Sequence, residues 1–175
     1  EQDEQATTHY IKAEGLLAAL TAHLRCLLTN PISWFTGVLH VVKWAGLDLK
    51  RFFYQAMYFT EALMVARWMR AQDQRHLHVH LGNVAATVGV YVKVVSGCSL
   101  SMTIHGPDEF YDSRTMLLRE KVEAADFIVC ISHFARSQMM LVSDPVHWHK
   151  FVVCRLGVDI AAFPLRQEPP ADESP

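Results

Sequence analysis

The stretch HLHVHLGNVAATVGVYVKVVSGCSLSMTIHG, residues 76–106, decides the fold. Residues 76–81 predict a short strand. Residues 83–97 follow with a helical pattern that has Asn83 as its N-cap and Gly97 just past its end. Residues 98–105 predict a second strand. A strand, a helix and a strand in this order indicate two parallel strands joined by a crossover helix.

The same alternation continues downstream. Helices are predicted over residues 114–125 and 133–142, and strands over residues 127–131 and 150–156. The residues that cap or delimit these elements are Ser113, Asp126, Ser132, Asp144 and Pro145. The strands look apolar on both faces, so we expect an α/β, Rossmann-like parallel sheet covered by helices on its two sides.

Residues 11–74 have a helical pattern throughout. Three helices are expected in this N-terminal region: the first ends at Asn30, the second runs from Pro31 to Gly46, and the third covers residues 47–72. One face of the first helix carries leucines at helical spacing, namely Leu16, Leu17, Leu20, Leu24, Leu27 and Leu28.

Aromatic residues are dense in the same region. They indicate either a core or a face that docks on a membrane or an acceptor, and helical spacing of aromatics more often marks a core. The residues concerned are Trp34, Phe35, Trp44, Phe52, Phe53, Tyr54, Tyr58 and Trp68.

Length and composition are those of one globular domain, with 175 residues, of which 51% are hydrophobic and 19% charged. The formal charge is only −2, so no overall field attracts nucleic acid or an anionic membrane. The longest uncharged stretch, residues 26–42, is broken by Asn30 and Pro31, which argues against a membrane span. We expect a cytoplasmic protein, with peripheral contact to the inner face of a membrane as an option for the aromatic helices.

The cysteines are scattered and form no Cys-x-x-Cys motif. We therefore expect four buried thiols in a reducing compartment: Cys26, Cys98, Cys130 and Cys154. The chain opens on the polar stretch EQDEQATTHY without an initiator methionine, which indicates an internal or processed fragment. Residues 1–163 are expected to form one domain, and the Pro-rich, acidic residues 164–175 a linker or tail.

Ligands of open parallel sheets bind beyond the carboxyl ends of the strands. Polar loops follow three predicted strands, at residues 80–83, 105–109 and 131–133, so we expect them to share one rim. The candidate binding residues near this rim are His78, His80, Gly82, Asn83, Gly106, Asp108, Glu109, Ser132 and Arg136.

His105 is the candidate catalytic residue, because an imidazole at this rim can orient, hydrogen-bond or polarise a polar ligand near neutral pH. Gly106 has no side chain and lets a ligand come close. The acids that follow can bind sugar hydroxyls or simply be solvated. Alternatively, the carboxylate of Asp108 or Glu109 takes the hydrogen bond of the His105 ring, which then has no catalytic role.

Ser132 begins a helix at the rim, where backbone N–H groups can meet a phosphate or hydroxyl. The alternative is a plain structural cap. Arg136 and Arg155 are candidate anion contacts.

His76, His78 and His80 alternate along one strand, so all three point to the same face. A His-x-His pair can bind zinc, but a site needs a third ligand and supporting hydrogen bonds. We expect His80 and His78 to line the cleft, His76 to be exposed, and no metal to be bound.

Four blocks, in this order and at these spacings, resemble the N-terminal domain of GT-B-fold glycosyltransferases of family 4. They are HLHVHLGNVAATVGV, SMTIHGPDEFYD, KVEAADFIVCISHFARSQM and FVVCRLGVDIAAF, and they cover residues 75–163. Leu81 stands where the family usually has Phe, and Arg155-Leu156 where a smaller or more polar pair is common. The residues that match the motifs are Thr103, His105, Gly106, Asp108, Ala125, Asp126, Ser132, Gly157, Val158 and Asp159.

The resemblance implies a retaining transfer of a sugar from a nucleotide-sugar to a polysaccharide or glycolipid acceptor, without a bound metal or other cofactor. It implies that His105 faces the donor sugar. It also implies a first strand ahead of the helical region and a second domain after Phe163 that holds most of the donor. We therefore expect the chain to be the acceptor-side half of a GT-B fold and to be inactive alone.

Two other classes remain open. The chain could be a non-catalytic Rossmann-like module that binds an acceptor or a partner protein. It could also be a metal-binding domain that uses His76, His78 and His80.

Overall fold

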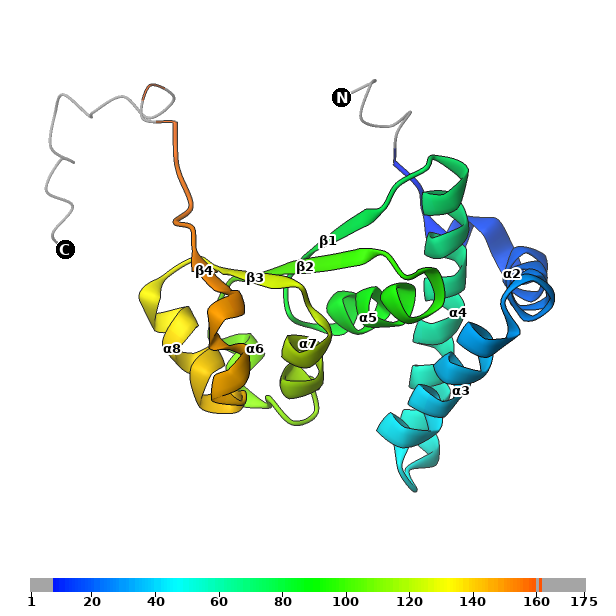
Figure 1. Ribbon diagram of the computed structural model, residues 1–175, viewed down its shortest axis with the longest axis horizontal. Coiled ribbons are helices and arrows are strands. Elements are labelled where there is room, and N and C mark those ends of the chain that lie inside the picture. The colour runs from blue at the N-terminus through cyan, green and yellow to red at the C-terminus, as the bar shows by residue number, and fades with distance from the viewer. Residues whose placement is uncertain (1–7, 160, 162–175) are drawn as a thin grey trace, which may run out of the picture.

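The chain forms one parallel sheet with helices packed against it (Figure 1). The computed structural model describes residues 8–159 and 161. The strands pair in sequence order, β1-β2-β3-β4, and every pair is parallel. This confirms the predicted fold class, an α/β, Rossmann-like sheet with a helical N-terminal region; the expected tail, residues 164–175, lies outside the described residues. The strands are β1 (His76–His80), β2 (Ser99–Ile104), β3 (Phe127–Cys130) and β4 (Phe151–Val153).

The helices largely follow the predicted pattern. Asn83 and Ser132 are N-caps whose side chains accept backbone N–H groups, as expected, and Asn30 caps α3 in the same way. Ser113 caps no helix: the chain turns there, and α7 begins only after Leu117. The helices are η1 (Ile11–Glu14), α2 (Gly15–Thr29), α3 (Pro31–Ala45), α4 (Leu49–Ala71), α5 (Val84–Ser96), α6 (Asp108–Tyr111), α7 (Leu118–Ala124), α8 (His133–Val142) and η2 (Pro145–Lys150).

The connecting helices lie on one face of the sheet only. Figure 1 shows α5, α7 and α8 all beneath the strands. Strands that pair in sequence order through right-handed crossovers must place every crossover helix on the same side. Leu100, Met102 and Ile128 point to this side and are completely buried. The expectation that helices cover both faces is therefore wrong for the described part of the chain.

The opposite face is polar along β1 and β2. His76, His78 and His80 are exposed there, as their alternation predicts. They cover the side chains of Ser101 and Thr103, which are 0% and 6% exposed. This face becomes apolar toward the other edge of the sheet, where Phe127 of β3 and Val152 of β4 are exposed.

The N-terminal helices are built around α4, which packs on α5 and carries α2 and α3 (Figure 1). A partly buried polar chain ties the three helices together: Trp34 Nε1 donates to His23 Nδ1 at 3.1 Å, and His23 Nε2 lies 2.9 Å from Thr60 Oγ1. Burial lowers the pKa of His23, which keeps this ring neutral. The bonds fix how α2 and α3 rotate on α4.

Side chains of the helical region divide between core and surface. Trp44 and Phe59 are buried, which agrees with the core interpretation, whereas Phe35 and Phe53 are 57% and 63% exposed. The leucine face of α2 also points to solvent. Among the cysteines, Cys98 and Cys130 are buried, Cys26 is half-buried, and all four thiols are free. Cys154 is exposed, so the expectation of four buried thiols is wrong at that residue.

The close approach of α3 to α4 depends on Gly37. A Cβ at this position would lie 2.2 Å from the ring of Phe59. We predict that Gly37→Ala destabilises the fold by about 1–3 kcal/mol, because the helices must move apart. Leu39→Ala, on the exposed side of the same helix, is the matched control and should change the free energy of unfolding by less than about 0.5 kcal/mol. Equal stability of the two variants in urea unfolding would contradict this packing.

Candidate functional site

The carboxyl ends of β1, β2 and β3 form one rim, as predicted. Leu81 N, just after β1, donates to Thr103 O of β2 at 2.9 Å, and Ile131 N, just after β3, donates to Ile104 O at 3.3 Å. These bonds extend the parallel ladders by one residue into the loops. The loops that carry the candidate binding residues therefore leave the sheet side by side.

Glu109 holds two of these loops together. Its side chain is 5% exposed, and its carboxylate accepts three backbone N–H groups. Oε2 accepts from His105 N at 2.7 Å and Gly106 N at 3.0 Å, and Oε1 accepts from Gly82 N. A carboxylate satisfied in this way supports the backbone, so the structure gives Glu109 a scaffold position instead of the predicted ligand-facing one.

Lys121 of α7 also binds the backbone of these loops, but as a positively charged donor instead of a negatively charged acceptor. It is 1% exposed, and its Nζ donates to Gly82 O at 2.8 Å, Asn83 O at 2.7 Å and Met116 O. Three carbonyl acceptors use all three N–H bonds of an ammonium group. Burial lowers the pKa of Lys121 to about 7, and the nearby Glu109 carboxylate opposes that shift.

The loop between β1 and α5 fits only because Gly82 has no side chain and the backbone turns sharply at Leu81. A Cβ at Gly82 would lie 2.7 Å from Ile104 Cδ1 and 3.0 Å from Glu109 Oε1. Leu81 has φ of 74°, a left-handed conformation that strains a residue other than glycine. The bonds from Glu109 and Lys121 to Gly82 hold this strained turn in place.

His80 and His105 meet at the rim. His80 Nδ1 lies 3.2 Å from His105 Nε2, and the two ring centroids are 5.4 Å apart. His80 is exposed and His105 half-buried. The backbone of His105 is fixed by Glu109, so its side chain is positioned without being enclosed. The structure thus brings together the two histidines that the sequence placed on different strands.

The other strand histidines are engaged with the sheet. His78 Nδ1 lies 2.7 Å from Ser101 Oγ, and its Nε2 lies 3.0 Å from Thr103 Oγ1. His76 Nε2 lies 2.8 Å from the same Ser101 Oγ, and its ring stacks on Phe127. His78 therefore lies beneath the rim with both ring nitrogens satisfied. Among the described residues, no three His, Cys, Asp or Glu side chains form a group that could hold a metal ion.

The start of α8 contributes a positive end to the rim. Ser132 Oγ accepts from Ala135 N at 3.1 Å, so its hydroxyl serves as the N-cap of α8, which starts just after the carboxyl end of β3. Arg136 follows one turn later and lies near Cys130. Its Nε is buried and has no hydrogen-bond partner within the described part of the chain. A buried donor without a partner favours an anion or a polar ligand here.

The remaining predicted binding residues lie at the same edge of the sheet but differ in their hydrogen bonding and exposure. Asn83 is the N-cap of α5, with its Oδ1 accepting from Ala85 N at 3.0 Å. Asp108 is exposed at the start of α6. The space above Gly106 is open, since a Cβ there would meet no atom within 4 Å. Asp108 and Gly106 are therefore accessible to a ligand next to His105.

Sequence reasoning missed Lys121. Its position carried a signal: Lys121 lies three residues after Leu118 and next to Val122, both of which are completely buried. Residues three or four apart share a helix face, so this lysine had to enter the interior. A lysine on the buried face of an amphipathic helix needs partners, and here they are rim carbonyls.

Comparisons with known proteins add no assignment. No family model matches the chain, and no curated protein matches it. A separate structural finding is that no helix within residues 8–159 is both long and apolar enough to cross a bilayer.

The first prediction for the site concerns Lys121. Lys121→Met removes the donor from three carbonyl oxygens and leaves the Glu109 carboxylate without its nearby cation. We expect a loss of about 3 kcal/mol in the free energy of unfolding. Lys50→Met, at an exposed position of α4, is the control and should be close to neutral. A Lys121→Met variant as stable as the control would refute the clamp.

The second prediction concerns pH. Burial, followed by the neighbouring His80 and His76, lowers the pKa of His78 below its usual value near 6.5. The folded state then binds this proton less readily than the unfolded state does. Stability from His78 is therefore complete above about pH 6.5 and is lost as the pH falls below it.

Thermal unfolding followed across this range should show a falling Tm. His78→Gln should reduce the fall, whereas His149→Gln, at an exposed residue of η2, should not. Part of the fall remains in both variants, because His23 also has a lowered pKa. An identical pH dependence in His78→Gln and the wild type would contradict the prediction.

Proposed function

We propose that the chain is the acceptor-side half of a glycosyltransferase that moves a sugar from a nucleotide-sugar to a saccharide or lipid-linked acceptor. The observation that carries the proposal is the clamped rim with His105 at its centre. The resemblance to family 4 enzymes of the GT-B fold supplies the reaction class, including retention of configuration and the absence of a required metal. The parallel sheet and the ligand edge at its carboxyl ends agree with that class.

The roles follow from the geometry of the rim. The His80–His105 hydrogen bond contains one N–H, so one ring donates and the other accepts. This bond orients His105 and leaves its second ring nitrogen for a sugar hydroxyl. Gly106 leaves space for the sugar beside that ring, and Asp108 offers a carboxylate to further hydroxyls. These contacts position the donor sugar for transfer.

The negative charge of the donor or of a phosphorylated acceptor has candidate partners at α8. The N-terminus of this helix and the unpaired Arg136 Nε favour an anion. Most of the nucleotide is assigned to a second domain, as the resemblance implies. We place the enzyme in the cytoplasm, at the inner face of a membrane when its acceptor is a lipid.

The proposal is tested by turnover with a panel of nucleotide-sugars, using the intact protein and the present chain. Product is expected from the intact protein only. His105→Ala should lower its kcat by about 100-fold or more with an unchanged Tm, because orientation of the sugar is lost. His149→Ala, outside the rim, should leave kcat unchanged.

Two results would overturn the proposal. An intact protein that binds a saccharide but transfers no sugar from any donor would instead be a non-catalytic binding module. A His105→Ala variant as active as the wild type would remove the rim from the reaction. Turnover by the present chain alone would refute the assignment of the donor site to a second domain.

A further inference from the structure

A pocket between α2, α4 and α5 combines positive charge with an apolar floor. Its volume is about 170 Å³. Three of the residues that line it are arginines, Arg25 of α2 and Arg67 and Arg70 of α4. The others are Cys26 and small or aliphatic residues such as Leu63, and none of the described residues that line the pocket is acidic.

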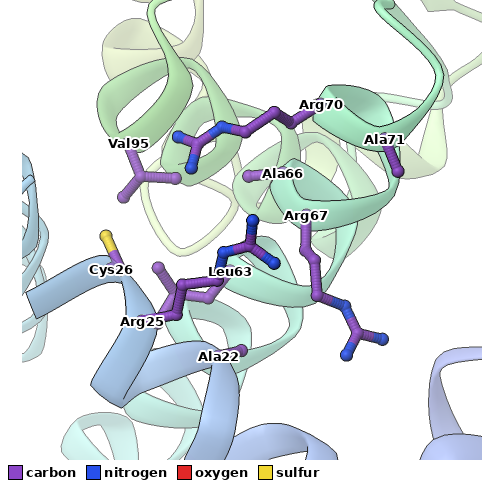
Figure 2. Close-up of a pocket in the computed structure, with 9 residues that line it drawn as sticks. All are labelled: Ala22, Arg25, Cys26, Leu63, Ala66, Arg67, Arg70, Ala71 and Val95. Carbon is purple, nitrogen blue, oxygen red and sulfur yellow. The ribbon is translucent and has the colours of Figure 1, made fainter. Parts of the chain in front are cut away.

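The guanidinium groups of Arg25 and Arg70 turn into this pocket. Figure 2 shows both directed toward its middle, whereas Arg67 points away from it. Arg67 binds the Glu14 carboxylate instead. Two cations that face the same small space repel each other, and an anion between them turns this repulsion into attraction. The orientation of the two side chains therefore favours a negatively charged ligand.

The acids closest to these arginines along the sequence are engaged elsewhere. Glu14 and Asp73 each pair with a different arginine. Within the described part of the chain, the guanidinium groups of Arg25 and Arg70 form no ion pair and no hydrogen bond. Their N–H donors are therefore available to a partner from outside these residues.

The thiol of Cys26 lies in the same pocket and stays neutral. Burial raises its pKa, and the positive charge of Arg70 only partly opposes that rise. A neutral thiol brings no negative charge that would repel an anion, and its S–H is a weak donor. The influence of Arg70 on this thiol also places the arginine's charge close to the wall that Cys26 forms.

The class of anion follows from charge and size. A phosphate monoester carries nearly two negative charges at neutral pH, so it balances two guanidinium groups better than a carboxylate does. Each arginine fork can bind two phosphate oxygens at once. The pocket volume of about 170 Å³ is well below the range for drug-sized ligands, which favours a small organic group.

We propose that the Arg25–Arg70 pocket binds a small phosphate monoester, with the phosphate between the two guanidinium groups and the organic group on the apolar floor. The site is separate from the rim. Arg70 lies at the end of α4 that leads into β1, and an adjoining pocket shares Arg70 and reaches Ser99, the first residue of β2. The site therefore lies at the amino end of the sheet, and the inference does not depend on the sugar-transfer reaction.

Isothermal titration calorimetry of the chain with phenyl phosphate tests the proposal. We expect saturable binding, and benzoate, with the same ring but a single charge, should bind more weakly. Arg25→Gln and Arg70→Gln should each weaken the binding of phenyl phosphate by about tenfold or more, because charge-assisted hydrogen bonds are lost. Arg114→Gln, outside the pocket, is the matched control and should bind as the wild type does. All three arginines are exposed, and an unchanged Tm verifies that the variants fold.

Alkylation of Cys26 locates the bound ligand. With phenyl phosphate at about ten times its Kd, modification of Cys26 by iodoacetamide should slow about tenfold, because only the unoccupied fraction exposes the thiol. Cys154 is exposed and lies outside the pocket, so its modification in the same sample should keep its rate. Peptide mass spectrometry separates the two thiols.

Three kinds of result would overturn the proposal. The first is the absence of saturable binding of phenyl phosphate to the wild-type chain. The second is binding that Arg25→Gln and Arg70→Gln leave unchanged, or that leaves the alkylation of Cys26 unchanged at saturation, since either would place the anion elsewhere. The third is benzoate binding as tight as that of phenyl phosphate, which would assign the pocket to carboxylates.

Discussion

Two buried charged side chains hold the rim of this protein together. Glu109 and Lys121 are 5% and 1% exposed, and each is engaged with backbone groups of the loops that leave β1 and β2. Removing a carboxylate and an ammonium group from water costs several kcal/mol for each ion, so such groups persist only where hydrogen bonds and an opposite charge compensate. The compensation here consists of loop N–H and carbonyl groups. The charges therefore convert two flexible connections into one fixed edge.

The functional proposal depends on that fixed edge. His105 is held by its backbone and steered by His80, while the neighbouring Gly106 keeps the space beside it open. Preorganised groups of this kind lower the entropy cost of bringing a sugar to a reactive position. The N-terminal helical region is separate from this edge. It encloses none of the rim residues, and its pocket lined by Arg25 and Arg70 lies between α2, α4 and α5.

The sequence predicted the elements well because their ends carry local signals. Asn83, Gly97 and Ser132 delimit helices through capping interactions, and these act within a few residues. The one-sided cover of the sheet was missed, because strand order is a property of the whole chain. The alternation of polar and apolar residues in His76–His80 and Ser99–Ile104 was the available clue, since it is typical of strands with one solvated face.

The candidate site was predicted in outline and missed in detail. Strand ends located His80, His105 and Ser132 at one edge, because parallel strands share their carboxyl side. Residues 108–112 contain three acids that look equivalent in sequence. Only the fold distinguishes the buried Glu109 from the exposed Asp108. The outward direction of the leucines on α2 was likewise undetermined, because a helical pattern shows that a face exists and not what it meets.

Amide hydrogen exchange at Gly82, His105 and Gly106 tests the central claim most directly. These amides lie in loops, yet each donates to the Glu109 carboxylate, so the account predicts protection comparable to that of the β2 amides. Glu109→Gln, which keeps the shape but loses the charge, should restore exchange at all three while β3 stays protected. Fast exchange of the three amides in the wild-type chain would contradict a rim held by buried charge.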